Sequence, residues 1–131
     1  MKLFKALALL IAMYGLTMTA TAQTTSYNTT KQHITPEEAR NHIGEVSTVC
    51  GKVASLHWAT KTKGEPTFIN LDRAYPNQIF TILIWGNDRP RFGNLEQDYM
   101  DKPLCVTGAI SSYRGVPEII TRSPGSIKLG Q

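Results

Sequence analysis

The chain has 131 residues, of which 14 are Lys or Arg and 10 are Asp or Glu, giving a formal net charge of +4. A charge this small excludes a protein whose whole surface attracts polyanions, so any such surface must be a local patch. The length is enough for one hydrophobic core and excludes two domains of ordinary size.

The first segment, residues 1–22, has the pattern of a secretory signal peptide. Lys2 and Lys5 precede an apolar run over Leu7–Leu16, and Ala20-Thr21-Ala22 fits the small-x-small pattern at which such peptides are cleaved. The apolar run is too short to span a membrane. We therefore expect a secreted or periplasmic protein without a membrane span, and cleavage would lower the net charge from +4 to +2 by removing the two lysines.

The chain contains two cysteines, Cys50 and Cys105. An even number of cysteines in an exported protein favours a disulfide over free thiols. The alternative is that both are small, buried, apolar side chains.

Residues 23–33 are polar and aperiodic, so we expect a flexible tether before a folded domain over residues 34–131. The domain begins with a helix start signal. Thr35 can cap the helix, Pro36 suits the first helical position, and Glu38 completes a capping box. A short helix is therefore predicted, ending at residue 43 before a glycine.

Five strand-like runs follow, each rich in β-branched and aromatic residues and bounded by turn residues. The second and third runs are expected to form a hairpin with Pro76-Asn77 at the two central positions of its turn. Both faces of the third run are apolar, so one should face the core while the other is covered or binds a ligand. Gly51 in the first run predicts a bulge or a sharp bend, and the tail with Ile127 and Leu129 is expected to add a last pairing. The runs are Val46–Ser55, Thr67–Leu71, Ile79–Trp85, Leu104–Ile110 and Pro117–Thr121.

The segment between the third and fourth runs breaks the strand pattern. Phe92, Leu95 and Tyr99 are spaced to form one side of a short helix. Arg89 and Arg91 form a basic-aromatic cluster with Phe92. This cluster either extends a binding groove or, the interpretation we prefer, consists of exposed arginines at the start of a helix.

Five short strands with a helical insertion between the third and fourth describe the OB-fold, a five-stranded Greek-key barrel. The segments GKVASLHWATKTKGEPTFINLD, YPNQIFTILIWG and CVTGAISSYRGVPEI resemble the OB-fold nucleic-acid-binding domains of the anticodon-binding-like group, as found in exported bacterial proteins and extracellular nucleases. The resemblance covers residues 34–129. It implies an all-β fold, a five-stranded OB-fold Greek-key barrel with a short N-terminal helix and a helical insertion between strands 3 and 4.

In that group the first and fourth strands are antiparallel neighbours. The alternation of side chains places Cys50 and Cys105 on matching, outward-facing sides of these two strands. The resemblance therefore implies a cross-strand disulfide that closes the barrel.

OB-folds bind oligonucleotides and oligosaccharides across the second and third strands and on the loops after the first and fourth. Aromatic side chains there can stack on bases, and basic ones can neutralise phosphates. Each residue also has a structural alternative: Trp85 could cap the barrel, and Phe68 is assigned to the core. The expected nucleic-acid-binding residues are Trp58, Lys61, Lys63, Asn70, Arg73, Tyr75, Thr81, Trp85, Tyr113 and Arg114.

Catalytic and metal-binding motifs are lacking in the sequence. His33, His42 and His57 have no ligand spacing to one another or to the cysteines, and no P-loop, dinucleotide fingerprint or G-x-S-x-G motif occurs. We therefore expect no enzyme, no metal and no cofactor. The first hypothesis is weak, sequence-tolerant binding of single-stranded nucleic acid. The second is an envelope module that binds a protein, a small ligand or an oligosaccharide and has no nucleic-acid affinity.

Overall fold

The structure, a computed structural model, describes Gly15, residues 19–22 and residues 33–130. The expected signal peptide over residues 1–22 lies largely outside the described residues, and so does the expected tether except for His33. In the described part of the chain, no helix has the length and apolar character needed to cross a membrane.

The described chain is mostly β, with little helix. A short strand at the start was not predicted, and it includes His33, which had been assigned to the tether. The strands are β1 (His33–Ile34), β2 (Val46–Trp58), β3 (Thr67–Leu71), β4 (Thr81–Ile84), β5 (Pro103–Tyr113), β6 (Val116–Ile120) and β7 (Ile127–Leu129). The helical turns are η1 (Glu38–Asn41), η2 (Arg89–Phe92), α1 (Leu95–Tyr99) and η3 (Pro124–Ser126).

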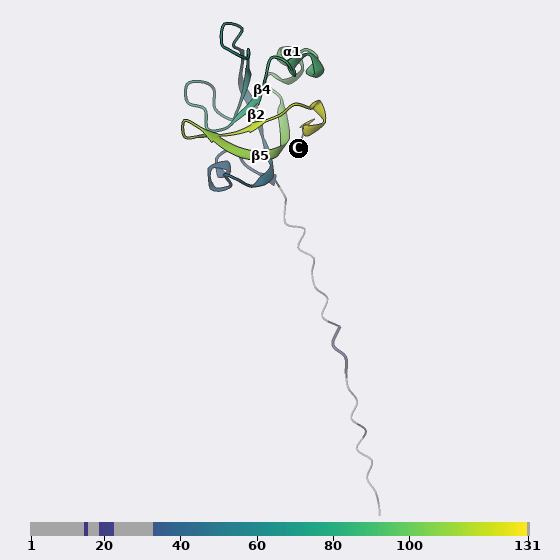
Figure 1. The fold of residues 1–131 in the computed structure, drawn as a ribbon. Helices are drawn as coiled ribbons and strands as arrows, with labels where there is room; N and C mark the ends of the chain where they lie inside the picture. The colour runs from purple at the N-terminus through teal and green to yellow at the C-terminus, as the bar shows by residue number, and fades with distance from the viewer. Residues whose placement is uncertain (1–14, 16–18, 23–32, 131) are drawn as a thin grey trace, which may run out of the picture.

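Five of the strands form a closed ring. The sheet order is β1-β2-β3-β4-β6-β5-β7, and an additional pairing of β2 with β5 closes the ring through β2, β3, β4, β6 and β5. Residues 46–52 of β2 pair with β5 and residues 53–58 pair with β3, both antiparallel. The β4–β6 pair is parallel. Figure 1 shows α1 at one end of this ring and the blue N-terminal segment around η1 at the other.

β2 bends where it changes partner. The predicted bend at Gly51 lies just before a register shift between Val53 and Ser55. A side chain at Gly51 has no room, because a Cβ there would lie 2.7 Å from Pro36 Cγ and 2.8 Å from Asp72 Oδ1. The glycine thus lets the N-terminal turn and the β3–β4 loop approach β2 closely.

The hydrophobic core fills the inside of the ring. On β4 the inward residues Ile82 and Ile84 are fully buried, as is Phe80 just before the strand. The outward residues Thr81 and Leu83 are also nearly buried, at 6% exposure each. Both faces of β4 are therefore covered, which accounts for the apolar character of both faces in the sequence.

The helical segments are shorter than predicted. In place of a helix to residue 43, η1 is a 3-10 turn of four residues. The predicted reciprocal pair still forms there: Glu38 N donates to Thr35 Oγ1 at 3.2 Å, and Thr35 N donates to the Glu38 carboxylate at 2.7 Å. In place of the expected helical insertion between β4 and β5, the chain makes only η2 and the five-residue α1. Gly93 lies between them with a φ of +68°, which neither helix can accommodate.

Several strand boundaries also differ from the prediction. β3 has the predicted bounds, whereas β2 continues three residues past Ser55 and β4 begins at Thr81 instead of Ile79. The hairpin turn is one residue earlier than expected. Its closing bond runs from Asn77 N to Ala74 O at 2.9 Å, so its central residues are 75 and 76.

The cross-strand disulfide is confirmed. Cys50 of β2 lies directly opposite Cys105 of β5 in the antiparallel ladder, and the two sulfurs are bonded at 2.02 Å. The bond joins positions 55 residues apart in sequence, at the pairing that closes the ring.

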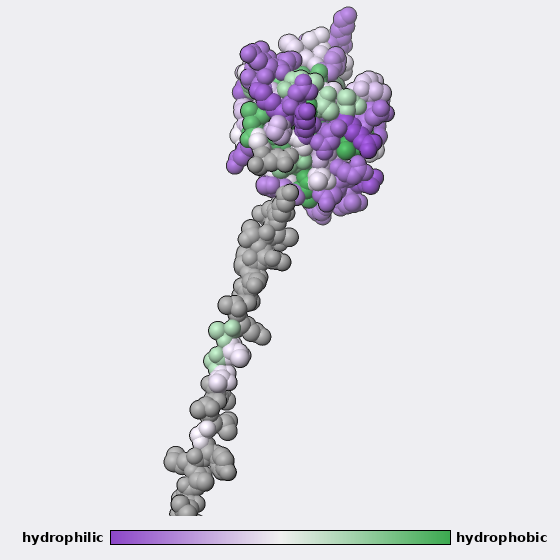
Figure 2. Space-filling view, turned by 180° about the vertical axis from the view of Figure 1, so that it is seen from behind, coloured by the Kyte–Doolittle hydropathy of each residue, from purple (hydrophilic) through white to green (hydrophobic). Residues whose placement is uncertain are grey.

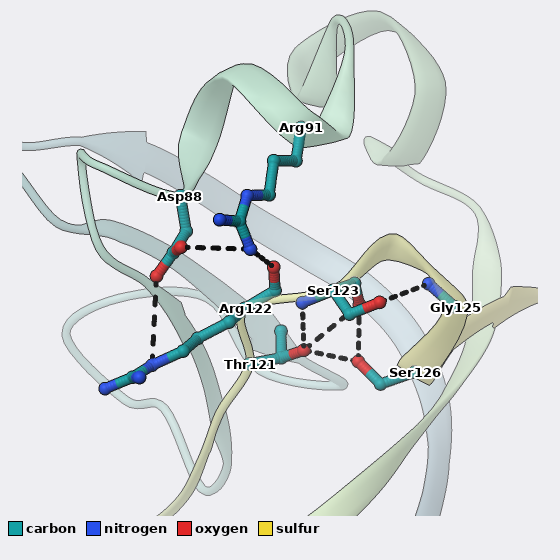
Figure 3. A network of polar contacts seen from close by, with 7 residues as sticks. All are labelled: Asp88, Arg91, Thr121, Arg122, Ser123, Gly125 and Ser126. Carbon is teal, nitrogen blue, oxygen red and sulfur yellow. Dashed lines mark hydrogen bonds and ion pairs between the residues drawn. The ribbon is translucent and has the colours of Figure 1, made fainter.

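Polar contacts hold the segment after β4 against the segment after β6, as Figure 3 shows. The Asp88 carboxylate lies between Arg91, at 3.6 Å, and Arg122, at 4.0 Å. Next to them, the hydroxyls of Thr121 and Ser126 contact each other. Exposed ion pairs contribute little stability individually, so we assign this network the role of positioning η3 against the end of the ring.

Gly51→Ala is expected to lower the free energy of unfolding by about 1–3 kcal/mol, because the added methyl group would overlap neighbouring atoms. Gly125→Ala is a matched control, since a Cβ there would meet only Ser123 Oγ at 3.5 Å. Urea denaturation followed by tryptophan fluorescence would measure both variants. Equal stability of the two would contradict the close approach at Gly51.

The double variant Cys50→Ala/Cys105→Ala is expected to lose about 2–4 kcal/mol of stability, because the disulfide restricts the unfolded chain. Adding reductant to the wild-type protein should produce a similar loss. Wild-type thiols that react with an alkylating reagent without prior reduction would show that the bond does not form.

Candidate functional site

A groove of about 710 Å³ lies over the outward faces of the strands and the β5–β6 turn. We call it the sheet groove. Its volume falls within the range of roughly 300–1,000 Å³ that is usual for ligand sites. Its lining residues are Ser55, His57, Ala59, Thr62, Phe68, Asn70, Tyr75, Gln78, Thr81, Tyr113, Arg114, Val116 and Glu118.

The floor of the groove carries a row of polar side chains, one from each of four adjacent strands. Ser55 of β2 lies opposite Asn70 of β3, Asn70 opposite Thr81 of β4, and Thr81 opposite Glu118 of β6. The Thr81 hydroxyl donates to Asn70 Oδ1 at 2.7 Å, and Asn70 Nδ2 donates to Ser55 Oγ at 2.9 Å. The backbone N–H of Tyr75 donates to the same Ser55 oxygen at 3.1 Å. We call these four side chains, Ser55, Asn70, Thr81 and Glu118, the polar row.

Glu118 is the member of the polar row without a partner. It is partly buried, and among the described residues its carboxylate has neither a hydrogen bond nor an ion pair. Burial raises the pKa of the Glu118 carboxyl, because a desolvated charge is disfavoured. Its two oxygens are available to accept hydrogen bonds from a ligand in the groove.

Aromatic side chains stand along the groove. Tyr75 on the β3–β4 loop is 74% exposed, and Tyr113 at the end of β5 is 58% exposed. The Arg114 guanidinium lies over the Tyr113 ring, 5.2 Å from its centroid. Phe68 was assigned to the core from the sequence, but it is only partly buried and lines the groove. Its position on β3 alternates with the inward residues, so it shares the outward face with Asn70.

Basic residues lie on each of the three loops that border the groove. Lys61 and Lys63 are on the β2–β3 loop, Arg73 is on the β3–β4 loop, and Arg114 is in the β5–β6 turn. All four are exposed, and within residues 33–130 none of them forms an ion pair. Their charges are therefore available to an anionic ligand.

The structure brings half of the predicted site residues together in the groove, and three more lie on its bordering loops. The residues that line it are Asn70, Tyr75, Thr81, Tyr113 and Arg114, and those on the loops are Lys61, Lys63 and Arg73. The remaining two, Trp58 and Trp85, do not line the groove.

Both tryptophans make structural contacts. The Trp58 ring lies 4.1 Å from the Arg89 guanidinium, in a cation–π contact. Arg89 also pairs with Glu96 at 2.7 Å, and only 12% of its side chain is exposed, so the preferred interpretation of Arg89 as an exposed arginine is wrong. Trp85 packs against Gly64, where a Cβ would lie 3.0 Å from the ring.

Eight lining residues were not predicted: Ser55, His57, Ala59, Thr62, Phe68, Gln78, Val116 and Glu118. Simple alternation along β2 would place Ser55 and His57 on the inward face with Val53, and the register shift between Val53 and Ser55 turns them outward instead. Glu118 is the one charged residue in an otherwise apolar strand, which was a usable signal. The Gln78 side-chain oxygen is buried without a hydrogen-bond partner in the described part of the chain, and the sequence held no signal for it.

One group of potential metal ligands occurs among the described residues. Donor atoms of His33, Cys50 and Cys105 lie within 4.8 Å of one another, a proximity that the sequence spacing did not predict. Because both sulfurs are joined in the disulfide, they are not thiolate ligands.

The surface seen in Figure 2 is mostly hydrophilic. Its hydrophobic areas are small and separated from one another. That face therefore offers no broad apolar surface for docking.

Among comparisons with known proteins, the likeness to one solved structure supports the fold, and it supports the fold alone. No protein-family model matches the chain, and no curated protein matches it. The chain is similar to a structure described as an aspartyl-tRNA synthetase from Leishmania major Friedlin, with 14% identity, a TM-score of 0.53, and coverage of 82% of this chain and 22% of the synthetase. It is also similar to OBody AM1L10 bound to hen egg-white lysozyme, with 16% identity, a TM-score of 0.48, and coverage of 69% of this chain and 83% of the other. This chain thus spans about a fifth of the synthetase.

Glu118→Gln is expected to raise the melting temperature at pH 7 and to leave it unchanged in acid, where the wild-type carboxyl is protonated. The pKa of Glu118 is higher in the folded than in the unfolded protein. The protonated Glu118 carboxyl therefore contributes fully to folding stability at a pH below its pKa in the unfolded chain. This contribution is lost as the pH rises through its pKa in the folded protein. Thermal unfolding from pH 3.5 to 7.5 would measure this difference. The exposed Glu65→Gln is the control, and a Glu118→Gln curve parallel to it would contradict the expectation.

Proposed function

We propose that this chain is an exported OB-fold module that binds single-stranded nucleic acid in the sheet groove, weakly and with little dependence on overall sequence. The observation that supports this proposal is the arrangement of side chains across the groove. Hydrogen-bonding groups lie on its floor, exposed tyrosines stand along it, and the loops around it carry cations that form no ion pair with any described residue. Single strands present polar base edges, flat base faces and a charged backbone, which match these three features.

The ring of five strands supports the OB-fold assignment. Its closure by β2–β5 pairing, with β4 and β6 parallel, fits a five-stranded Greek-key barrel. The likeness to part of the synthetase structure adds support at the level of the fold. Because OB-folds take many ligands, the functional proposal depends on the groove and not on the fold.

Export is supported by two independent features. Residues 1–22 have the signal-peptide pattern. The Cys50–Cys105 disulfide suits an oxidising compartment, where such bonds form and persist. We therefore expect the ligand to be met in the periplasm or outside the cell.

Binding is expected to weaken with salt, because phosphate contacts release counterions. The four unpaired cations on the bordering loops limit the number of these contacts. With a slope of about −0.7 per phosphate for single strands, log K should fall against log salt with a slope no steeper than about −3. This small electrostatic contribution is the reason that we expect weak binding.

Tyr75→Ala and Tyr113→Ala are each expected to weaken binding about 5- to 150-fold, since stacking on one aromatic ring is worth about 1–3 kcal/mol per base. Fluorescence anisotropy with labelled single-stranded DNA and RNA at several salt concentrations would measure this. Leu129→Ala is the control, because Leu129 is an exposed apolar residue outside the groove. Equal affinity of all three variants and the wild type would contradict the proposed surface.

A second candidate function is the binding of a neutral oligosaccharide. The observation that favours it is the polar row, whose uncharged members suit hydroxyl groups and whose Glu118 opposes phosphates. This candidate predicts saturable oligosaccharide binding that is insensitive to salt. It also predicts that single-stranded DNA and RNA fail to bind at low salt.

A further inference from the structure

We propose that Glu118 makes one position of the sheet groove selective for guanine, by accepting hydrogen bonds from the two adjacent N–H groups of that base. This inference rests on the proposed function, since it assigns a base preference to one position within otherwise sequence-tolerant binding.

The neighbours of Glu118 leave its carboxylate in need of donors. Glu118 lies opposite Thr81 on one side and Ser111 on the other. The Thr81 hydroxyl hydrogen is donated to Asn70, and the Ser111 hydroxyl is directed at the backbone carbonyl of Glu118, at 3.5 Å. Since no other described residue donates a hydrogen bond to this carboxylate either, its donors can come from a ligand or from water.

Tyr113 is placed to hold a base beside this carboxylate. It lies two residues beyond Ser111 on β5 and on the same outward face, which makes it a diagonal neighbour of Glu118 across the β5–β6 pair. Diagonal neighbours are about 7–8 Å apart, within reach of an aromatic side chain. A base stacked on the exposed Tyr113 ring can direct its edge towards Glu118. Arg114, which lies over the same ring, can then contact the adjoining phosphate.

The chemistry of a carboxylate selects among the bases. An ionised carboxylate only accepts hydrogen bonds, and the Watson–Crick edge of guanine offers an N–H and an amino group side by side. Adenine and cytosine offer an amino group next to an acceptor nitrogen, and thymine offers one N–H between two carbonyl oxygens. Only guanine can therefore satisfy both carboxylate oxygens without placing an acceptor against them.

The test uses short oligothymidines that carry one central variable base, guanine, adenine, cytosine, thymine or hypoxanthine. Anisotropy would be measured at pH 7.5 and low salt with the purified secreted protein. The guanine oligomer is expected to bind about 5- to 150-fold more tightly than the adenine, cytosine and thymine oligomers, the range typical of one bidentate base contact. Hypoxanthine, which lacks the amino group of guanine, should bind with intermediate affinity.

Glu118→Gln is expected to abolish the guanine preference, because an amide offers one donor and one acceptor. Glu45→Gln, a matched change outside the groove, should keep it. Equal binding of all oligomers by the wild type, or a guanine preference that survives Glu118→Gln, would overturn the role of Glu118 while leaving nucleic-acid binding intact. Failure of the wild type to bind any oligomer would instead overturn the proposed function. The guanine–hypoxanthine comparison tests the inference on unmodified protein, should the variant fail to fold.

Discussion

The groove depends on one constraint, the change of partner halfway along β2. The first half of this strand pairs with β5 and the second with β3, so the ring closes only because β2 bends between them. Gly51 permits the bend by leaving room for the residues packed against it. The disulfide at Cys50 holds β5 in register beside the same point. A slip of one residue in β5 would turn its outward side chains inwards, and Tyr113 would leave the groove.

The polar and charged side chains of this fold are of two kinds: some are held in contacts within the protein, and others are available to a ligand. Asn70 and Thr81 are almost fully buried, and their hydrogen bonds to each other and to Ser55 remove the cost of burying them. Arg89, Arg91 and Arg122 are occupied by carboxylates. Glu118 is the exception, a desolvated acid that costs stability and whose carboxylate has no hydrogen-bond or ion-pair partner among residues 33–130. Such perturbed groups in a groove are typical of functional sites.

Where the sequence interpretation was wrong, a tertiary contact or a local turn overrode the pattern. The helix signals at residues 35–38 and 92–99 are real, but Gly93 interrupts the second and only a 3-10 turn forms at the first. Phe68 was placed in the core because of its hydrophobicity, whereas its outward position puts it in the groove. The ligand-binding role of Trp58 stays a prediction: its side chain is 41% exposed, and Arg89, from a segment 31 positions along the chain, contacts its ring.

The sequence by itself determined the five main strands apart from their exact ends, and the exposed loops that carry the basic residues, because strand alternation and turn residues act over a few neighbouring positions. The closing disulfide was predicted from the family resemblance. Only the tertiary structure decided which side chains share the groove. Ser55, Asn70, Thr81 and Glu118 come from four strands spread over 64 positions of the sequence. Their alignment into one row follows from the strand register, which is set by the whole closed ring and is not encoded in any one segment.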